Sequence, residues 1–277
     1  MSKCRVAIDA GHGSNTAGKR TPDGYREHWI NVKTAYYCEQ YLKANGVEVV
    51  RIAWDDLDAT DDTDVSLSKR QDLVEASGCL VSVSMHGNAY GNGKSFNSAN
   101  GVSTHIHENN NCANDSLKLG QYVQAQLVKG TSQKNRGVVR QALAMCNCKA
   151  MGTKASILCE NGFMTNKVEA DLMKTEAFLK EQGEDIARGI LLYLEDIGAM
   201  VKAPVSNPVS NPVSTSGSFK VRTKAVMNVR AGAGTQYKIN TVAPIGVYTI
   251  VATSGSWGKL KSGSGWINIS SKYATRL

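Results

Sequence analysis

The N-terminal part of the chain alternates between short apolar runs and longer segments whose apolar residues recur with helical spacing. The apolar runs predict strands at residues 5–9, 47–53, 80–84, 101–107 and 155–159. The helical segments are 26–45, 67–76, 115–128, 167–174 and 176–197. Strands and helices that alternate in this way predict an α/β fold, with a mostly parallel sheet and helices on both faces.

The last 60 or so residues show a different pattern, with short β-rich segments, glycine-containing turns and no helical period. The predicted strands are 219–223, 225–230, 239–242, 247–253, 258–261 and 265–269. Six short strands in so few residues are typical of a small all-β barrel.

Between these parts lies AMVKAPVSNPVSNPVSTSG, at residues 199–217, which repeats Val-Ser-Asn-Pro and holds three of the chain's five prolines. A Pro- and Ser-rich segment without apolar periodicity predicts an extended linker. We therefore expect a first domain at 1–198, a linker at 199–217 and a second domain at 218–277.

Charge separates the same two parts. Residues 1–198 contain 22 Lys and Arg against 24 Asp and Glu, a net −2, whereas residues 199–277 contain 10 Lys and Arg and no acidic residue, a net +10. This concentration of positive charge in one part favours an anionic partner, which is nucleic acid, a membrane surface or an anionic wall polymer. Nucleic acid is disfavoured, because the basic part has no recognisable nucleic-acid motif and no helix that would fit a groove.

The chain starts with a short polar segment and a strand-like run, without the apolar stretch and cleavage site of a signal peptide. No segment approaches the roughly 20 apolar residues that span a bilayer. We therefore expect synthesis in the cytoplasm and no membrane insertion. The seven cysteines are odd in number and lie mostly in apolar runs, so we expect buried, reduced thiols. Cys146 and Cys148 are spaced too closely for the usual metal knuckle.

Three titratable residues follow apolar strands, namely His12, His86 and Glu160. Glu27, at the start of the first helix, falls beside the same edge of the predicted sheet, where ligands collect in open parallel sheets. Two imidazoles and one carboxylate form a zinc site with an open fourth position, and zinc makes water a nucleophile near neutral pH. The remaining carboxylate, Glu160, is then placed to move the proton.

Other interpretations compete with this site. A histidine at a strand end often has only a structural hydrogen bond, and Glu27 also suits the first turn of a helix. His28 is a rival ligand, although neighbouring helical residues point about 100° apart, so one of the two faces the metal. His105 and His107 share a strand face and form either a second site or an exposed polar surface.

Several segments together resemble one enzyme family. They are IDAGHG, Glu27 at 15 residues after His12, SVSMHGNA, RGV at 136–138 and LCENGFMTN at 158–166. In this order they are similar to the zinc-dependent N-acetylmuramoyl-L-alanine amidases of the amidase-3 type, over residues 3 to about 196.

The resemblance implies that His12, Glu27 and His86 bind one zinc ion and that Glu160 is catalytic. It implies hydrolysis of the amide between N-acetylmuramic acid and the L-alanine of the peptidoglycan stem peptide. Ala10 departs from the family, whose members often carry proline there, and we expect no effect on the ligands.

The segments MNVRAGAGTQYKINTVAPIG and SGSWGKLKSGSGWINISSKYATRL resemble bacterial SH3-like (SH3b) domains, over residues 218–277. Such domains commonly bind peptidoglycan, which makes Tyr237, Trp257 and Trp266 candidate binding residues. Each of these aromatic residues is equally suited to core packing.

The two resemblances together indicate a wall hydrolase held on its polymer by a binding domain. With no signal peptide, the combination looks like a phage endolysin that is released at lysis and acts on the cell wall. A bacterial autolysin or sporulation amidase is the next interpretation. A catalytically silent wall-binding protein and a zinc endopeptidase acting on the stem peptide are the alternatives.

Overall fold

The computed structural model describes residues 4–108, 112–129, 131, 133–200, 218–235, 237 and 239–277. The chain divides into two compact units, one made of Met1–Val128 and Ser132–Val201 and the other mainly of Lys202–Leu277. The predicted linker lies, from residue 201 onward, outside the described residues, so its extended form stays a prediction.

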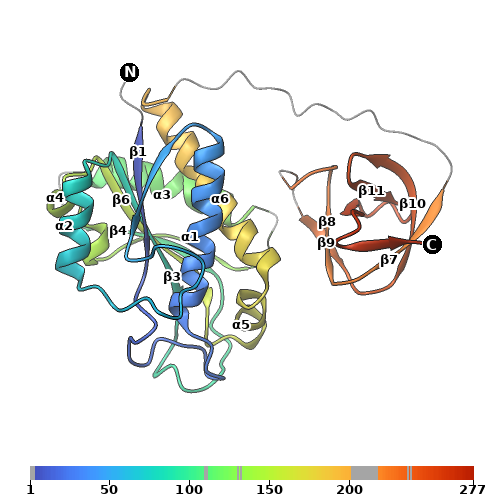
Figure 1. The fold of residues 1–277 in the computed structure, drawn as a ribbon, viewed down its shortest axis with the longest axis horizontal. Coiled ribbons are helices and arrows are strands. Elements are labelled where there is room, and N and C mark those ends of the chain that lie inside the picture. Colours follow the sequence, from blue (N-terminus) through green and yellow to red (C-terminus); the bar gives the residue numbers. More distant parts are fainter. Residues whose placement is uncertain are drawn as a thin grey trace. The chain divides into compact units, whose positions relative to one another are not determined.

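The first unit is built on a six-stranded sheet in the order β2-β1-β3-β6-β4-β5 (Figure 1). Strands β2, β1, β3 and β6 run parallel, β4 is antiparallel to β6, and β5 is parallel to β4. The prediction of a mostly parallel sheet is confirmed. The strands are β1 (Arg5–Ala10), β2 (Glu48–Ile52), β3 (Val81–Asn88), β4 (Val102–Ile106), β5 (Asn135–Arg140) and β6 (Ala155–Phe163).

Helices cover both faces of this sheet, as the sequence pattern predicts. One face is covered by α1 (Glu27–Ala44), α3 (Ala113–Leu127) and α6 (Glu176–Asp196). The other is covered by α2 (Leu67–Ser77), α4 (Cys148–Met151) and the short 3-10 helix η1 (Ala144–Cys146), while α5 (Lys167–Met173) packs against β6 and α6. None of the described helices is long and apolar enough to cross a membrane.

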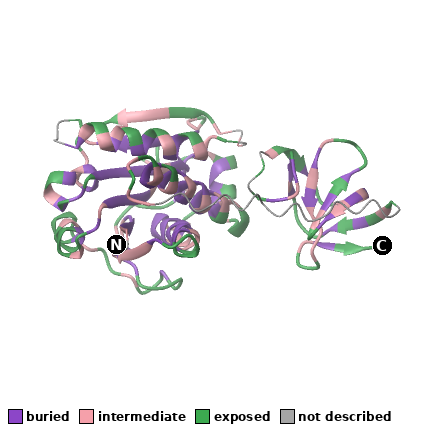
Figure 2. Ribbon diagram, turned by 90° about the horizontal axis from the view of Figure 1, so that it is seen from above, coloured by how far each residue is buried: buried purple, intermediate pink, exposed green. Residues whose placement is uncertain are grey.

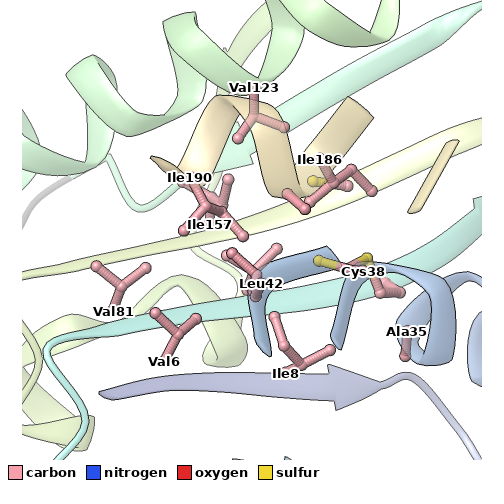
Figure 3. Close-up of a cluster of buried hydrophobic side chains, with 14 of the residues drawn as sticks. Val6, Ile8, Ala35, Cys38, Leu42, Val81, Val123, Ile157, Ile186 and Ile190 are labelled. Atoms are coloured by element: carbon pink, nitrogen blue, oxygen red, sulfur yellow. The ribbon is translucent and has the colours of Figure 1, made fainter. Parts of the chain in front are cut away.

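Alternation along the strands divides the apolar core between the two faces. Val6 and Ile8 of β1 belong to the large cluster beneath α1, α3 and α6, whereas Ala7 belongs to a smaller cluster beneath α2. Figure 3 shows Val6 and Ile8 directed toward Leu42 of α1, with Ile190 of α6 near the same cluster. Figure 2 shows buried residues along the strands and exposed residues on the outer sides of the helices.

The predicted and observed elements differ mainly at the strands that carry the candidate site. β3 continues to Asn88 and β6 to Phe163, because the two strands go on pairing with each other there, so His86 and Glu160 lie within strands rather than after them. The edge strand β5 was not predicted, since its sequence NRGVVR is polar, contains glycine and stays largely exposed.

The second unit is a seven-stranded antiparallel sheet in the order β13-β7-β10-β11-β12-β8-β9. Its buried cluster includes Val221, Val229, Ile250, Leu260 and Ile267. Only β13 was not predicted, because three residues ending in Thr-Arg show no apolar run. The strands are β7 (Phe219–Thr223), β8 (Met227–Arg230), β9 (Ile239–Ala243), β10 (Val247–Ser254), β11 (Trp257–Leu260), β12 (Trp266–Asn268) and β13 (Ala274–Arg276).

The expectation that all cysteines are reduced is wrong for two of them. A disulfide joins Cys112, at the start of α3, to Cys148 of α4, with Cα atoms 6.4 Å apart. The two residues are 36 positions apart, and only the fold brings them together. Burial raises the pKa of the Cys146 thiol to about 12.

Candidate metal centre

Three ligand-type side chains converge at the edge of the first unit's sheet. His12 follows β1, Glu27 begins α1 and His86 lies near the end of β3. One donor atom from each lies within 4.8 Å of the others. Nε2 of His12 is 3.2 Å, and Nδ1 of His86 3.1 Å, from the same Oε1 of Glu27. The sequence-predicted ligands are therefore side by side, from three separate segments.

Two glycines leave the room that this arrangement needs. A Cβ on Gly11 would lie 2.2 Å from the ring of His86, so any other residue there would displace that ring. The backbone N–H of Gly87 donates to Oε1 of Glu27 at 3.2 Å, and a Cβ on Gly87 would press on Met164. The glycines of the segments AGHG and MHGN thus have a steric role in placing the ligands.

The centre is partly enclosed and favours a charged Glu27. The side chain of Glu27 is 2% exposed, whereas those of His12 and His86 are 18% and 15% exposed. Burial acts to raise the pKa of Glu27, but hydrogen bonds from His12 and His86, together with their charges, outweigh burial and hold this pKa well below its usual range. The carboxylate is therefore ionised at neutral pH, which is the state a metal ligand needs.

The rival ligand His28 points elsewhere. Its Nδ1 lies 2.9 Å from the carbonyl oxygen of Gly11, and its Nε2 lies 2.8 Å from Oδ2 of Asp62. His28 is fully used in bracing the backbone before His12, so Glu27 alone of the pair faces the two histidines.

Glu160 stands beside His86 without joining the three-residue cluster. The two residues are direct partners in the parallel pairing of β3 and β6, so their side chains leave the same face of the sheet. Oε2 of Glu160 is buried and has no hydrogen-bond partner among the residues that the structure describes. Burial raises the pKa of Glu160 well above its usual range, the Glu27 carboxylate adds to this shift, and Lys19 opposes it.

The alternative site at His105 and His107 gains no support. His105 is buried on β4, with Nε2 3.0 Å from Oγ of Ser103, so the interpretation as an exposed polar face is wrong for this residue. Within the described parts of the chain, His12, Glu27 and His86 form the only group of three such ligands.

Sequence reasoning missed the side chains that hold the centre from behind. Nδ2 of Asn31 donates to the carbonyl oxygen of Gly11 at 3.1 Å, and the guanidinium of Arg70 reaches the carbonyl oxygen of His12 at 2.6 Å. No pattern in the sequence marks either residue, because a polar residue in a predicted helix normally faces solvent.

In the second unit, two of the three candidate aromatic residues share one face. Antiparallel pairing sets Trp257 opposite Asn268 and Lys259 opposite Trp266, so all four side chains leave the outer face of the β11–β12 hairpin, while Gly258 and Ile267 turn inward. Both tryptophans are half-buried.

Tyr237 adjoins this face through its backbone. Trp266 also pairs with Arg230, whose Nη1 donates to the carbonyl oxygens of Thr235 and Tyr237 at 2.8 and 2.9 Å. The Tyr237 ring packs against Gly232, where a Cβ would lie 2.4 Å from it. Trp257, Lys259 and Trp266 therefore form one surface, which we name the hairpin face, while Tyr237 is linked to it only through its backbone carbonyl and Arg230.

Comparisons with known proteins agree with this arrangement. A family model described as N-acetylmuramoyl-L-alanine amidase (Amidase_3) matches residues 6–191. The endolysin of Bacillus phage SPP1 is 29% identical over 286 aligned residues, covering 99% of this chain and 98% of the endolysin. The N-acetylmuramoyl-L-alanine amidase LytC of Bacillus subtilis (strain 168) is 27% identical over 188 residues, which are 68% of this chain and 35% of that protein.

A solved structure shows the same fold for the first unit. The N-acetylmuramoyl-L-alanine amidase from Clostridium difficile 630 has a TM-score of 0.61 and 30% sequence identity. The match covers 70% of this chain and 98% of that chain. The match therefore includes nearly the whole of the amidase chain.

Proposed function

The chain belongs to the N-acetylmuramoyl-L-alanine amidase family, and from this premise we propose that it is a zinc-dependent peptidoglycan hydrolase. The bond it cleaves is the amide between the lactyl group of N-acetylmuramic acid and the L-alanine that begins the stem peptide.

The observation that carries the proposal is the convergence of His12, Glu27 and His86. Two imidazole nitrogens and an ionised carboxylate, with donor atoms within 4.8 Å of one another, suit zinc, and three protein ligands leave a position for the reaction. The buried Oε2 of Glu160 also fits, because a catalytic carboxylate has to keep an oxygen available and this one has no hydrogen-bond partner within the described part of the chain. When bound, zinc supplies a Lewis acid that polarises the carbonyl and makes water a nucleophile near neutral pH.

The chain's own groups divide the remaining work. Glu160 takes the proton from the attacking water and delivers it to the leaving nitrogen, which has to be protonated before the amine departs. Its burial limits competing solvent contacts, and its pairing with His86 keeps the carboxylate next to the ligands. The exposed Lys19 contributes a positive charge that favours the ionised form of Glu160.

We propose further that the second unit is an SH3-like wall-binding domain. Its hairpin face offers aromatic surface for sugar or peptide, and the net +10 of residues 199–277 attracts anionic wall polymers. Binding to the wall raises the concentration of substrate around the catalytic unit. The relative that aligns over nearly the whole chain is an endolysin, which supports release from an infected cell and action on the cell wall.

The test is chemical identification of the cleavage products. Purified cell walls treated with the protein should yield new free amino termini that are L-alanine, with N-acetylmuramic acid freed of peptide. Chelation should stop the reaction, and added zinc should restore it. New termini at other stem-peptide residues would show that the protein is an endopeptidase and not an amidase. Binding without new termini would show a wall-binding protein without catalytic activity.

A further inference from the structure

Arg70 is unusual for a charged residue in the first turn of a surface helix, because it is buried. It lies on α2, on the face of the sheet opposite α1, and its side chain is only 2% exposed. Its neighbour Lys69 is exposed, as the helical pattern of α2 would lead one to expect. Burying a guanidinium costs folding free energy unless the group is paired and hydrogen-bonded, so the partners of Arg70 indicate its role.

Those partners include the backbone at and just before the candidate ligand His12. Nη1 donates to Oδ1 of Asp9 and to the carbonyl oxygen of Ala10, each at 2.7 Å. Nη2 donates to the carbonyl oxygen of His12 at 2.6 Å and to Oδ1 of Asp64 at 3.1 Å. A single planar group thus holds the backbone immediately before and immediately at His12.

Two further contacts fix the guanidinium itself. Nε of Arg70 donates to the carbonyl oxygen of Val65 at 2.8 Å, which ties it to the loop before α2. Oγ of Ser84 on β3 donates to the second oxygen of Asp9, so that carboxylate is held as well. We call Arg70 and the groups it bonds (Asp9, Ala10, His12, Asp64 and Val65) the Arg70 clamp. This clamp joins β1, β3 and the start of α2.

His12 needs such a clamp because of its backbone. Its φ of 65° lies in the left-handed region that side-chain-bearing residues rarely adopt, and such residues persist where the surroundings over-determine them. The carbonyl oxygen of Gly11 is held from the other side by His28 and Asn31. Without Arg70, the carbonyl oxygens of Ala10 and His12 would lose these hydrogen bonds, and we expect the backbone at His12 to relax toward an ordinary φ. The imidazole would then turn away from Glu27.

We propose that Arg70 is a positioning residue that orients His12 for zinc, an inference that rests on the proposed zinc site. The forked guanidinium suits this role, because three nitrogens separated in a plane reach Val65, Ala10, His12 and Asp64 at once. Lysine keeps the charge but concentrates its donors on one atom, so it cannot make all of these bonds. Changes in groups that orient metal ligands typically cost about 10–100-fold in metal affinity.

The experiment measures the zinc dissociation constant of the full chain by competition with a chelator, together with the melting temperature of the metal-free protein. We expect Arg70→Lys to weaken zinc binding at least about tenfold, while saturating zinc still fills one site per chain. The control is Arg51→Lys, which disturbs the 2.9 Å pair between Arg51 and Glu39, away from the centre. This control should lower the melting temperature and leave zinc affinity unchanged.

The role is overturned if Arg70→Lys binds zinc as tightly as the original protein, or if both variants lose affinity in proportion to their melting temperatures. If Arg70→Lys does not fold, Asp64→Asn tests the same clamp from its exposed end. It should weaken zinc binding severalfold, and an unchanged affinity would equally overturn the role. Failure of the original chain to bind zinc would reject the proposed function itself, which separates the two outcomes.

Discussion

The two units place their candidate functional groups in opposite environments. In the first unit, Glu27 and Glu160 are withdrawn from solvent and their neighbours come from several distant segments. In the second unit, the hairpin face is a surface of half-exposed rings and an exposed Lys259, set by the register of one hairpin. Chemistry needs preorganised, desolvated groups, whereas polymer binding needs accessible ones, so changes in the first unit should alter turnover and changes in the second should alter binding.

The largest effect is expected from His86→Ala in the first unit. Losing one of three protein ligands should abolish zinc binding and hydrolysis together. Metal analysis of the purified variant, beside a turnover assay, checks this. His107→Ala, which removes a histidine outside the cluster, should keep both. Full zinc occupancy in His86→Ala would contradict the ligand assignment.

Glu160→Gln should separate metal binding from catalysis. The amide is nearly isosteric but cannot accept the proton, so turnover should fall about 100- to 10,000-fold while zinc content stays normal. Steady-state kinetics with zinc analysis measures both. Glu39→Gln, a change at a buried carboxylate paired with Arg51, should leave turnover unaffected. A Glu160→Gln protein with normal zinc and more than about a tenth of the original rate would refute the role.

Removal of residues 199–277 should have the opposite effect, lowering wall binding while hydrolysis is retained. The first unit has its own core, so the shortened protein should stay folded and hydrolyse a small soluble muropeptide at a rate within about twofold of the full chain. Its binding to intact walls should fall and lose its salt dependence, because the net +10 is gone. Equal wall binding by both proteins at low and high ionic strength would show that the second unit does not target the enzyme.

The smallest effects are expected within the hairpin face. Trp266→Ala should weaken wall binding about three- to tenfold, or about 0.7–1.4 kcal/mol, and Lys259→Ala about twofold. Lys220→Ala removes the same charge from β7, another strand of the same unit, and serves as the control. Pull-down on purified walls, with melting temperatures, measures each. If Lys220→Ala and Lys259→Ala weaken binding equally, net charge and not the hairpin face explains wall binding.

Much of the fold was predictable because it depends on local patterns. Apolar runs alternate with segments of helical spacing along the chain before the linker, and the mostly parallel sheet follows from this pattern. The short polar strands β5 and β13 were not, since they are stabilised by pairing with neighbours and not by their own apolar residues. The candidate ligands were predictable for a related reason, because the ends of parallel strands and the helix that follows meet at one edge.

What the sequence determined by itself is the set of candidate residues and the order in which they occur, since both follow from periodicity and from recognisable segments around His12, His86 and Glu160. The tertiary structure decided where the side chains of neighbouring residues point. It turned Glu27 toward the histidines and His28 toward Asp62, and it buried Arg70 beside the exposed Lys69. It also joined Cys112 to Cys148. These choices depend on side-chain direction and on contacts between residues far apart in the chain, which local spacing does not encode.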